Sequence, residues 1–355
     1  MHHDEITEAV REAAFRFVDE AYPKQALARP YLDEQGYLPA LSRLIAEQGW
    51  YGIMAPEEAG GTGLGLEGGA IILEAAGRGI VAEPVFETAA LVVPLLAQLG
   101  ENLQGLLEET ISGACLPALL HPWGQAEPAD LVHMDASDRL TGTLAAVPVA
   151  ASADLWLVPG RSGEGEFRLC RLAPDAPGVA MTTTAAMDGR RFAKISLTGA
   201  EAQVVAKGSG AEAAFRESLL QAALLSCAES LGSMTWLIAT TADYLKSRRQ
   251  FQVPLASFQV LQHRMVDMEL ALVEARSTLD AALHAAGSAA FPRAVALAQI
   301  VTARSARIVG ADAVQLHGGI GMTDELAVSR HFKRLLFNEF RFGGAEPWLR
   351  KYQAA

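Results

Sequence analysis

The chain has 355 residues, hydrophobic types make up 50% of it, and its formal net charge is −12. That length and composition allow a large buried interior, organised as one domain or as two to three packed domains. The negative charge, which no Lys/Arg-rich block offsets, argues against nucleic acid as a partner, and three cysteines without CxxC spacing argue against a disulfide framework or a zinc knuckle.

The widely spaced cysteines favour a location in a reducing cytoplasm. The N-terminal MHHDEITEAVREAAFRF carries acids where a signal peptide needs a basic start and an apolar core. No uninterrupted apolar run of about 18 residues occurs, so no membrane span is expected. We also expect no metal site, since the cysteines lie far apart.

Helices are predicted for residues 1–115. Apolar residues return every three or four positions from about residue 4 to residue 49, on either side of a break at Gly36 and Pro39, and again over residues 70–77 and 87–99. Between them, MAPEEAGGTGLGLEGG (residues 54–69) breaks the period with a proline and clustered glycines. We interpret this stretch as a connector. A phosphate-binding loop is the alternative, although no strand precedes it and no Lys-Ser/Thr pair follows it.

Strands are predicted for residues 116–207. The runs RLTGTLAAVPVA, ADLWLVPGR, GEFRLCRLAP, GVAMTTT and FAKISLTG are short and β-rich, and turn residues such as Pro159-Gly160 and Pro177-Gly178 bound them. They predict a small antiparallel β domain.

Long helices are predicted for residues 208–355. Apolar residues alternate at four and three positions over residues 220–245 and 261–283. A third helix is expected from Pro292 to Leu316, and a fourth from near Asp324 to about Phe337. Four antiparallel helices of this length form a bundle. The predicted fold class is therefore α+β, mainly α, with an N-terminal helical domain (1–115), a middle β domain (116–207) and a C-terminal four-helix bundle (208–355).

Two stretches of the bundle are dense in polar residues. The first, SRRQFQVPL followed by SFQVLQHRMVDM (residues 247–268), closes one long helix, turns at Pro254 and opens the next. Arg248 and Arg249 can complement the dipole of a helix C-terminus. Beside an aromatic and two amides they can instead hold a pyrophosphate bidentately. In the second stretch, QLHGGIGMT (residues 315–323), a helix ends in glycines, which allow backbone amides to approach a ligand.

Together and in this order, the two stretches resemble the acyl-CoA dehydrogenase family. RRQFxxPLxxFQxxQHRxxDM is similar to that family's RxQFGxPIxxFQxxQHxLADM, and QLHGGIGMTDE is similar to its QxxGGxGxxxE. MAPEEAGGTGLG further resembles the family's PEExGGxGL loop, so the resemblance covers nearly the whole chain. It implies N-terminal helices, a middle β-barrel-like domain and a C-terminal four-helix bundle, with FAD bound between domains and across a subunit interface.

The resemblance also implies which residues bind the cofactor. Arg249 and Phe251 match residues that contact the pyrophosphate and adenosine end of FAD, usually in a neighbouring subunit, and Gln262 belongs to the same shared surface. Gln315, Gly318 and Gly319 match the loop that lies against the dinucleotide from the partner chain. The chain is therefore expected to be an obligate oligomer, either a homotetramer or an α2β2 heterotetramer with a paralogous subunit.

In this family a carboxylate removes the α-proton of an acyl-CoA thioester while hydride passes from the β-carbon to flavin N5. The usual position of the base is nine residues after the arginine of an RxxK stretch, and Arg330 with Lys333 puts Glu339 there. Glu339 is therefore the predicted catalytic base. One alternative is that Glu339 is a solvated acid paired with Arg334 or Arg341. The other is a base on the first long bundle helix, where the matching position is Ala222 and Glu217 lies five residues away.

The chain departs from the family in several places. Asn338-Glu339-Phe340-Arg341 replaces the common Tyr-Glu-Gly-Thr, and Gln252 stands where the family has glycine. The glycine, serine and aspartate of a TEPxxGSD-like stretch are missing from LHPWGQAEP (residues 120–128), and AAVPVA (residues 145–150) occupies the segment expected against the isoalloxazine ring. This pattern resembles the shorter members that pair with a different subunit, often on bulky acyl groups such as steroid side chains.

Three functions remain open at this point. The first is FAD-dependent α,β-dehydrogenation of an acyl-CoA in lipid or steroid catabolism, with an electron-transferring flavoprotein as acceptor. The second is a non-catalytic partner subunit that completes an FAD site while another chain supplies the base. The third is a flavin oxidase or monooxygenase on the same fold.

Overall fold

The computed structural model describes residues 2–22, 36–121, 124, 132–323 and 325–354. Packing groups the chain into two compact units: residues 1–30, 70–81 and 223–355 form the first, and residues 31–69 and 82–222 form the second. Helices come first along the chain, strands follow, and long helices close it, as the sequence predicts. The predicted division into three domains stays a prediction.

The N-terminal part is helical, as expected from its apolar period. Among its described residues, three short segments are π- or 3-10-helical, and the five α-helices are α1 (His2–Ala21), α2 (Pro39–Glu47), α3 (Gly65–Gly79), α4 (Val93–Leu99) and α5 (Gln104–Ile111). Helix α3 begins five residues before the predicted start, so part of the glycine-rich stretch is helical. Gly68 fits there because a Cβ would lie 2.6 Å from the Leu64 Cβ and 2.9 Å from the Ile53 Cγ1.

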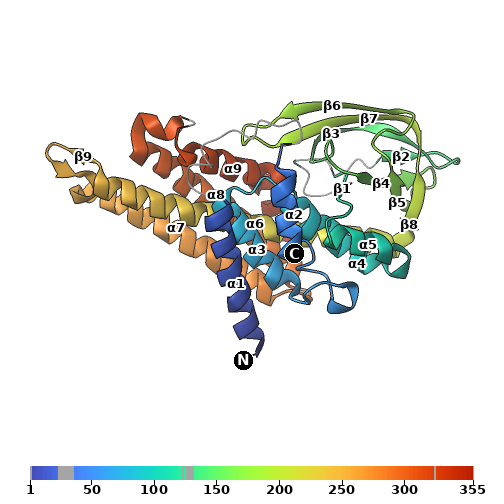
Figure 1. The fold of residues 1–355 in the computed structure, drawn as a ribbon, viewed down its shortest axis with the longest axis horizontal. Helices are drawn as coiled ribbons and strands as arrows, with labels where there is room; N and C mark the ends of the chain where they lie inside the picture. Colours follow the sequence, from blue (N-terminus) through green and yellow to red (C-terminus); the bar gives the residue numbers. More distant parts are fainter. Residues whose placement is uncertain (1, 23–35, 122–123, 125–131, 324, 355) are drawn as a thin grey trace. The chain divides into compact units, whose positions relative to one another are not determined.

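The strands form one sheet with the order β6-β7-β3-β2-β4-β5-β8, and β1 pairs with β4 (Figure 1). They are β1 (Pro117–Leu119), β2 (Val132–Met134), β3 (Arg139–Pro148), β4 (Leu155–Ser162), β5 (Phe167–Leu172), β6 (Val179–Ala185), β7 (Arg191–Glu201) and β8 (Gln203–Lys207). All five predicted runs are strands. The pairs of β3 with β7, β6 with β7, and β4 with β5 are antiparallel, whereas β1 and β2 run parallel to β4.

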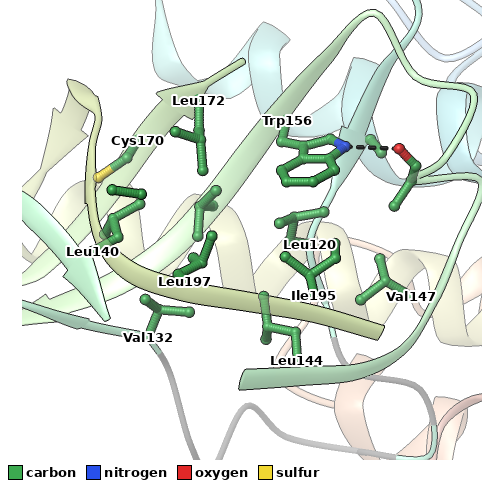
Figure 2. Close-up of a cluster of buried hydrophobic side chains, with 14 of the residues drawn as sticks. Leu120, Val132, Leu140, Leu144, Val147, Trp156, Cys170, Leu172, Ile195 and Leu197 are labelled. Atoms are coloured by element: carbon green, nitrogen blue, oxygen red, sulfur yellow. Dashed lines mark hydrogen bonds between the residues drawn. The ribbon is translucent and has the colours of Figure 1, made fainter. Parts of the chain in front are cut away.

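An apolar cluster fills the inside of this sheet (Figure 2). Leu144 and Ile195 face each other across β3 and β7, and Trp156 is fully buried among aliphatic side chains. The indole Nε1 of Trp156 donates a hydrogen bond to the Ala150 carbonyl at 2.8 Å, which satisfies the polar atom of an otherwise apolar side chain. Hydrophobic burial therefore dominates the stability of this part.

The C-terminal part consists of long helices: α6 (Gly208–Ser247), α7 (Gln259–His284), α8 (Phe291–His317), α9 (Ala327–Arg341) and α10 (Ala345–Ala354). Helix α8 matches the predicted bounds within one residue at each end. Helices α7 and α8 run side by side over most of their length (Figure 1). Asp324, the predicted start of the fourth helix, lies outside the described residues. Helix α9 ends four residues beyond the predicted Phe337, because its last turn buries polar side chains that find partners.

Helices α3 and α6 cross at two glycines. A Cβ on Gly77 would lie 1.8 Å from the Glu229 carbonyl oxygen, and a Cβ on Gly232 would lie 1.8 Å from the Glu74 carbonyl oxygen. The Ser233 hydroxyl donates to the Gly77 carbonyl at 2.9 Å across the same crossing. Only glycine allows two helix backbones to approach this closely.

Two helical spans among the described residues are long and apolar enough to cross a membrane by length and composition, Gly208–Ser247 and Phe291–Met322. In the first, 89% of the apolar window is buried inside the protein, and in the second 56%. Both are core helices of this fold.

Candidate functional site

Arg249 lies in a short hairpin after α6. Strand β9 (Arg249–Gln250) pairs with β10 (Val253–Pro254), and Phe251 and Gln252 form the two-residue turn with φ of 50° and 67°. Left-handed backbone at both turn positions suits a tight hairpin but is unfavourable for residues other than glycine. The Arg249 Nη2 donates to the Gln252 carbonyl at 2.7 Å, which stabilises the turn. The Arg249 side chain is exposed, and its other N–H groups donate to no residue that the structure describes, so they can bind a ligand.

The hairpin presents an aromatic ring to solvent. Phe251 is 86% exposed, and its ring meets the edge of Phe258 at 6.3 Å between centroids. Gln262, in the first turn of α7, is exposed and donates to the Ala256 carbonyl at 2.8 Å. An exposed aromatic ring can stack on an adenine. A nearby guanidinium can bind a pyrophosphate.

The second stretch lies at the end of α8. Gln315 is exposed, Gly318 has a φ of 71° as the C-cap, and Gly318–Met322 forms a 3-10 helix. A Cβ on Gly318 or Gly319 would meet no atom within 4 Å, so a ligand can reach the backbone there. Without side chains, these positions let a ligand approach the backbone closely. The Gly318 N–H itself donates to the Val314 and Gln315 carbonyls.

Tyr244 and His317, two residues that the sequence analysis did not single out, join the two stretches. Their rings stack at 4.4 Å between centroids, and the Tyr244 hydroxyl donates to the His317 carbonyl at 3.4 Å. Tyr244 lies in the last turn of α6, five residues before Arg249, and His317 directly precedes Gly318, so the contact brings both stretches to one end of the bundle. Burial lowers the pKa of His317, which keeps its ring neutral. Only its place inside the QLHGG stretch could have indicated its role.

The residues implied for FAD therefore fit one end of that cofactor. A guanidinium, an exposed aromatic ring and open glycine backbone match the pyrophosphate and adenosine. For the flavin ring, residues 122–123 and 125–128 of the expected β-domain stretch lie outside the described residues. The segment of residues 145–150 ends β3 with a bulge and holds Ala146 and Val149 at φ of 53° and 50°.

Glu339 is buried and held by an arginine. It lies in the last turn of α9, is 8% exposed, and accepts hydrogen bonds from Arg307 Nε at 3.0 Å and 2.8 Å on its two oxygens. The Arg307 Nη2 also donates to it. The bond to Glu339 raises the pKa of Arg307, while the Arg307 side chain remains 62% exposed. The alternative of a solvated Glu339 paired with Arg334 or Arg341 is therefore wrong, because Glu339 is buried and binds Arg307.

Arg334 and Arg341 bind another acid, Glu229 on α6. Arg334 Nη1 donates to Glu229 Oε1 and Arg341 Nη1 to Oε2, each at 2.7 Å, and all three side chains are at most 3% exposed. Arg334 also donates to the Val81 carbonyl at 3.2 Å. One signal of this cluster is visible in the sequence, an acid inside the apolar period of α6. Glu217, the alternative base, is half-buried and accepts from Gln221 at 3.0 Å, one helical turn away.

The chain matches two models of one protein family: "Acyl-CoA dehydrogenase, C-terminal domain" over residues 208–351 and "Acyl-CoA dehydrogenase, N-terminal domain" over residues 4–106. It is 30% identical over 330 residues to the acyl-CoA dehydrogenase FadE27 of Mycobacterium tuberculosis, covering 90% of this chain and 88% of that protein.

Two solved structures are also similar. The ChsE4-ChsE5 complex from Mycobacterium tuberculosis contains a chain with a TM-score of 0.88 and 27% identity, covering 98% of this chain and 96% of that one. A variant of the Tcur3481-Tcur3483 steroid ACAD gives a TM-score of 0.89 and 28% identity, covering 99% and 98%.

Proposed function

The chain belongs to the acyl-CoA dehydrogenase family of FAD-dependent oxidoreductases, and from this premise we propose that it serves as one of two different subunits of an α2β2 acyl-CoA dehydrogenase. In this assembly it contributes residues that bind FAD, while the other subunit contributes the catalytic base. The observation that carries the proposal is the state of Glu339, whose two carboxylate oxygens both accept hydrogen bonds from Arg307.

A base for α-proton removal needs a carboxylate oxygen that can reach the substrate and bind a proton. At Glu339, both carboxylate oxygens already accept hydrogen bonds from the Arg307 guanidinium, so neither oxygen is open to a substrate proton. Glu339 is therefore better suited to hold α8 against α9.

The other position considered for the base offers no carboxylate. It is Ala222 on α6, and Glu217, five residues away, accepts a hydrogen bond from Gln221.

The flavin-binding role rests on Arg249, Phe251, Gln262, Gln315, Gly318 and Gly319. FAD supplies the hydride acceptor when it is bound. We infer that the Arg249 guanidinium holds the pyrophosphate, that Phe251 covers the adenosine, and that the backbone of Gly318 and Gly319 approaches the dinucleotide. Because all six residues are exposed, they can serve a flavin shared with a neighbouring subunit.

An apolar stripe on α7 supports the assembly. Val266, Leu270 and Val273 follow one another at four and three residues and are 55%, 58% and 57% exposed. Three large apolar side chains on one helix face are typical of a surface that a partner covers. The stripe lies on the helix that begins beside the flavin-binding hairpin, so a partner seated on it can share the cofactor.

The substrate in this proposal is a bulky acyl-CoA thioester of the steroid type. The supporting observation is the similarity over nearly the whole chain to a structure described as a steroid ACAD. An electron-transferring flavoprotein is the proposed acceptor, and the cytoplasm is the proposed location.

The proposal is tested by purifying the chain alone and co-expressed with the paralogous subunit encoded beside it, then measuring flavin content and flavin bleaching by acyl-CoA thioesters. We expect bleaching only from the co-expressed complex, and unchanged bleaching in Glu339→Gln. Arg249→Ala should weaken flavin retention about tenfold or more, as loss of a charge-assisted hydrogen bond predicts, whereas the neighbouring Arg248→Ala should not. Bleaching by the chain alone would overturn the two-subunit proposal and favour a homotetramer.

Assembly has its own test. Leu270→Asp should prevent co-purification of the two subunits, since it places a charge in the apolar stripe. Met187→Asp, an equivalent change at a residue 62% exposed in the turn between β6 and β7, serves as the control. Undiminished complex formation by Leu270→Asp would remove α7 from the interface.

A second candidate keeps Glu339 as the catalytic base. It is favoured by the exposure of Arg307, which is 62%, because an exposed guanidinium can rotate away when substrate binds. Loss of bleaching in Glu339→Gln with full flavin content would select this candidate.

A further inference from the structure

Beneath Glu339 lies a small polar cavity between α6, α8 and α9. It offers about 10 Å³ to the centre of a water molecule, and its walls are formed by Ser226, Cys227, Ser230, Gln299, Thr302, Ala303, Ala306, Asn338 and Glu339. One water needs roughly 10–15 Å³ by this measure. The cavity can therefore hold a single water and excludes an acyl chain or a nucleotide.

Asn338 supplies the polar atom that points to a ligand. The residue is 2% exposed, and its Nδ2 donates to the Ser230 hydroxyl at 3.3 Å. Its Oδ1 is buried and accepts no hydrogen bond from any described residue. A buried amide oxygen without a donor is unfavourable, so a donor in the cavity would stabilise the fold.

Other polar groups in the cavity wall can also hydrogen-bond to a ligand in the cavity. The Ser230 hydroxyl donates to the Ser226 carbonyl at 2.9 Å and accepts from Asn338, which leaves one of its lone pairs available. Gln299 uses its amide to donate to the Ser226 hydroxyl at 2.9 Å and to the Ala223 carbonyl. Thr302, 4% exposed, faces the Cys227 thiol, a weak acceptor. Asn338, Ser230 and Thr302 thus provide the two to four partners that a buried water requires.

The chemistry of the wall decides between ligands of this size. An anion is disfavoured because the Glu339 carboxylate lines the cavity. A monovalent metal ion is disfavoured because Arg307 already neutralises that carboxylate. Burial raises the pKa of Cys227 to about 12, so the wall contains no thiolate.

We propose that this cavity binds one ordered water, which donates to Asn338 Oδ1 and links α6, α8 and α9 beneath the Arg307–Glu339 pair. The water makes Asn338 a positioning residue for the last turn of α9. The inference concerns the interior of the bundle and does not depend on which subunit supplies the base.

A crystal structure of the complete chain, at a resolution that shows ordered waters, tests the proposal. We expect one density peak in the cavity within about 2.7–3.2 Å of Asn338 Oδ1, the range of a hydrogen bond. Thr302→Val, which removes a hydroxyl at nearly constant volume, should weaken or remove the peak. Thr278→Val, the same change on α7 at a hydroxyl bonded to the Ala275 carbonyl, should leave it unchanged.

Solution measurements cover the case in which a variant does not crystallise. Water magnetic relaxation dispersion counts long-lived internal waters, and Asn338→Leu, which removes the acceptor and fills the space, should show one fewer than the parent chain. An empty cavity in the parent crystal structure, or an equal count in the parent and Asn338→Leu, would overturn the proposal.

Discussion

The core of the β sheet is built from apolar side chains around Trp156 (Figure 2), whereas most buried residues of α9 are charged or polar. The buried polar face of α9 carries Arg330, His331, Arg334, Asn338, Glu339 and Arg341. In an apolar core each side chain contributes roughly in proportion to the area it buries. In a charged core each member depends on its partner, because an ion left alone in the interior is strongly unfavourable. The two regions should therefore respond differently to loss of one side chain.

The largest effect is expected at Glu229. Glu229→Ala should lower the free energy of unfolding by about 3–5 kcal/mol, because Arg334 and Arg341 would lose the carboxylate that both bind in the interior. Denaturant unfolding measures the change. Glu274→Ala is the control, since it removes an ion pair with Arg304 whose side chains are 51% and 66% exposed, a kind of pair that contributes about 0–1 kcal/mol. Similar losses in the two variants would mean that the charged core does not depend on pairing.

In the sheet, Ile195→Ala should lower the free energy of unfolding by about 2–5 kcal/mol, through lost burial and the cavity left behind. Ile195→Val, which keeps most of the volume, should lower it by about 0.5–1.5 kcal/mol. This graded response is what distinguishes an apolar core. A loss in Ile195→Val as large as that in Ile195→Ala would contradict it.

The pH dependence of stability gives a further test of the buried polar face of α9. Burial, with Arg334 and Arg78 nearby, lowers the pKa of His331 well below 6.5, so the folded chain keeps the ring neutral while the unfolded chain protonates it below about pH 6.5. His331 should therefore reduce stability as the pH falls below 6.5, by up to about 1.4 kcal/mol per pH unit.

His331→Phe should remove this part of the slope, because phenylalanine can keep the stack on Trp236, now 4.0 Å between centroids, without a titrating group. Urea unfolding between pH 5 and 7 measures the slope. His263→Gln, at an exposed position of α7, should leave it unchanged. An unaltered slope in His331→Phe would assign the acid sensitivity to other groups, His317 first among them.

The smallest effect is expected from the hydrogen bond inside the apolar core. Trp156→Phe would leave the Ala150 carbonyl without its indole donor and would leave a small space. The bond itself accounts for about 0.5–1.5 kcal/mol of the expected loss. Thermal unfolding followed by circular dichroism measures it. A loss as large as that of Glu229→Ala would erase the distinction between the two regions.

The same difference explains how much the sequence could predict. Helices and strands leave their signals in residues that are close together in the sequence. The apolar period predicted the ends of α8 within one residue, and β-rich runs bounded by turn residues predicted five strands. The family motifs placed Arg249 and Gly318 in two stretches that the Tyr244–His317 contact brings together. By contrast, the partners of the buried charges lie far apart in sequence, with Arg307 and Glu339 separated by 32 residues and Glu229 and Arg341 by 112.

Local pattern therefore could not predict which arginine binds which acid, or that α9 continues to Arg341. The start of α3 at Gly65 was missed for a related reason. Clustered glycines ordinarily break a helix, and only the close packing of Gly68 against Leu64 and Ile53 explains why this helix tolerates them.

The crossing of α3 and α6 has a practical consequence for mutational scanning. At Gly77 and Gly232 every side chain, even a methyl group, would overlap the opposite backbone, so all substitutions at these two sites should reduce folded protein regardless of cofactor or substrate. A scan of this chain therefore contains an internal reference. The loss of folded protein at the two glycines shows the effect of failed folding alone. Variants that keep normal abundance but lose activity instead identify positions needed for chemistry or assembly.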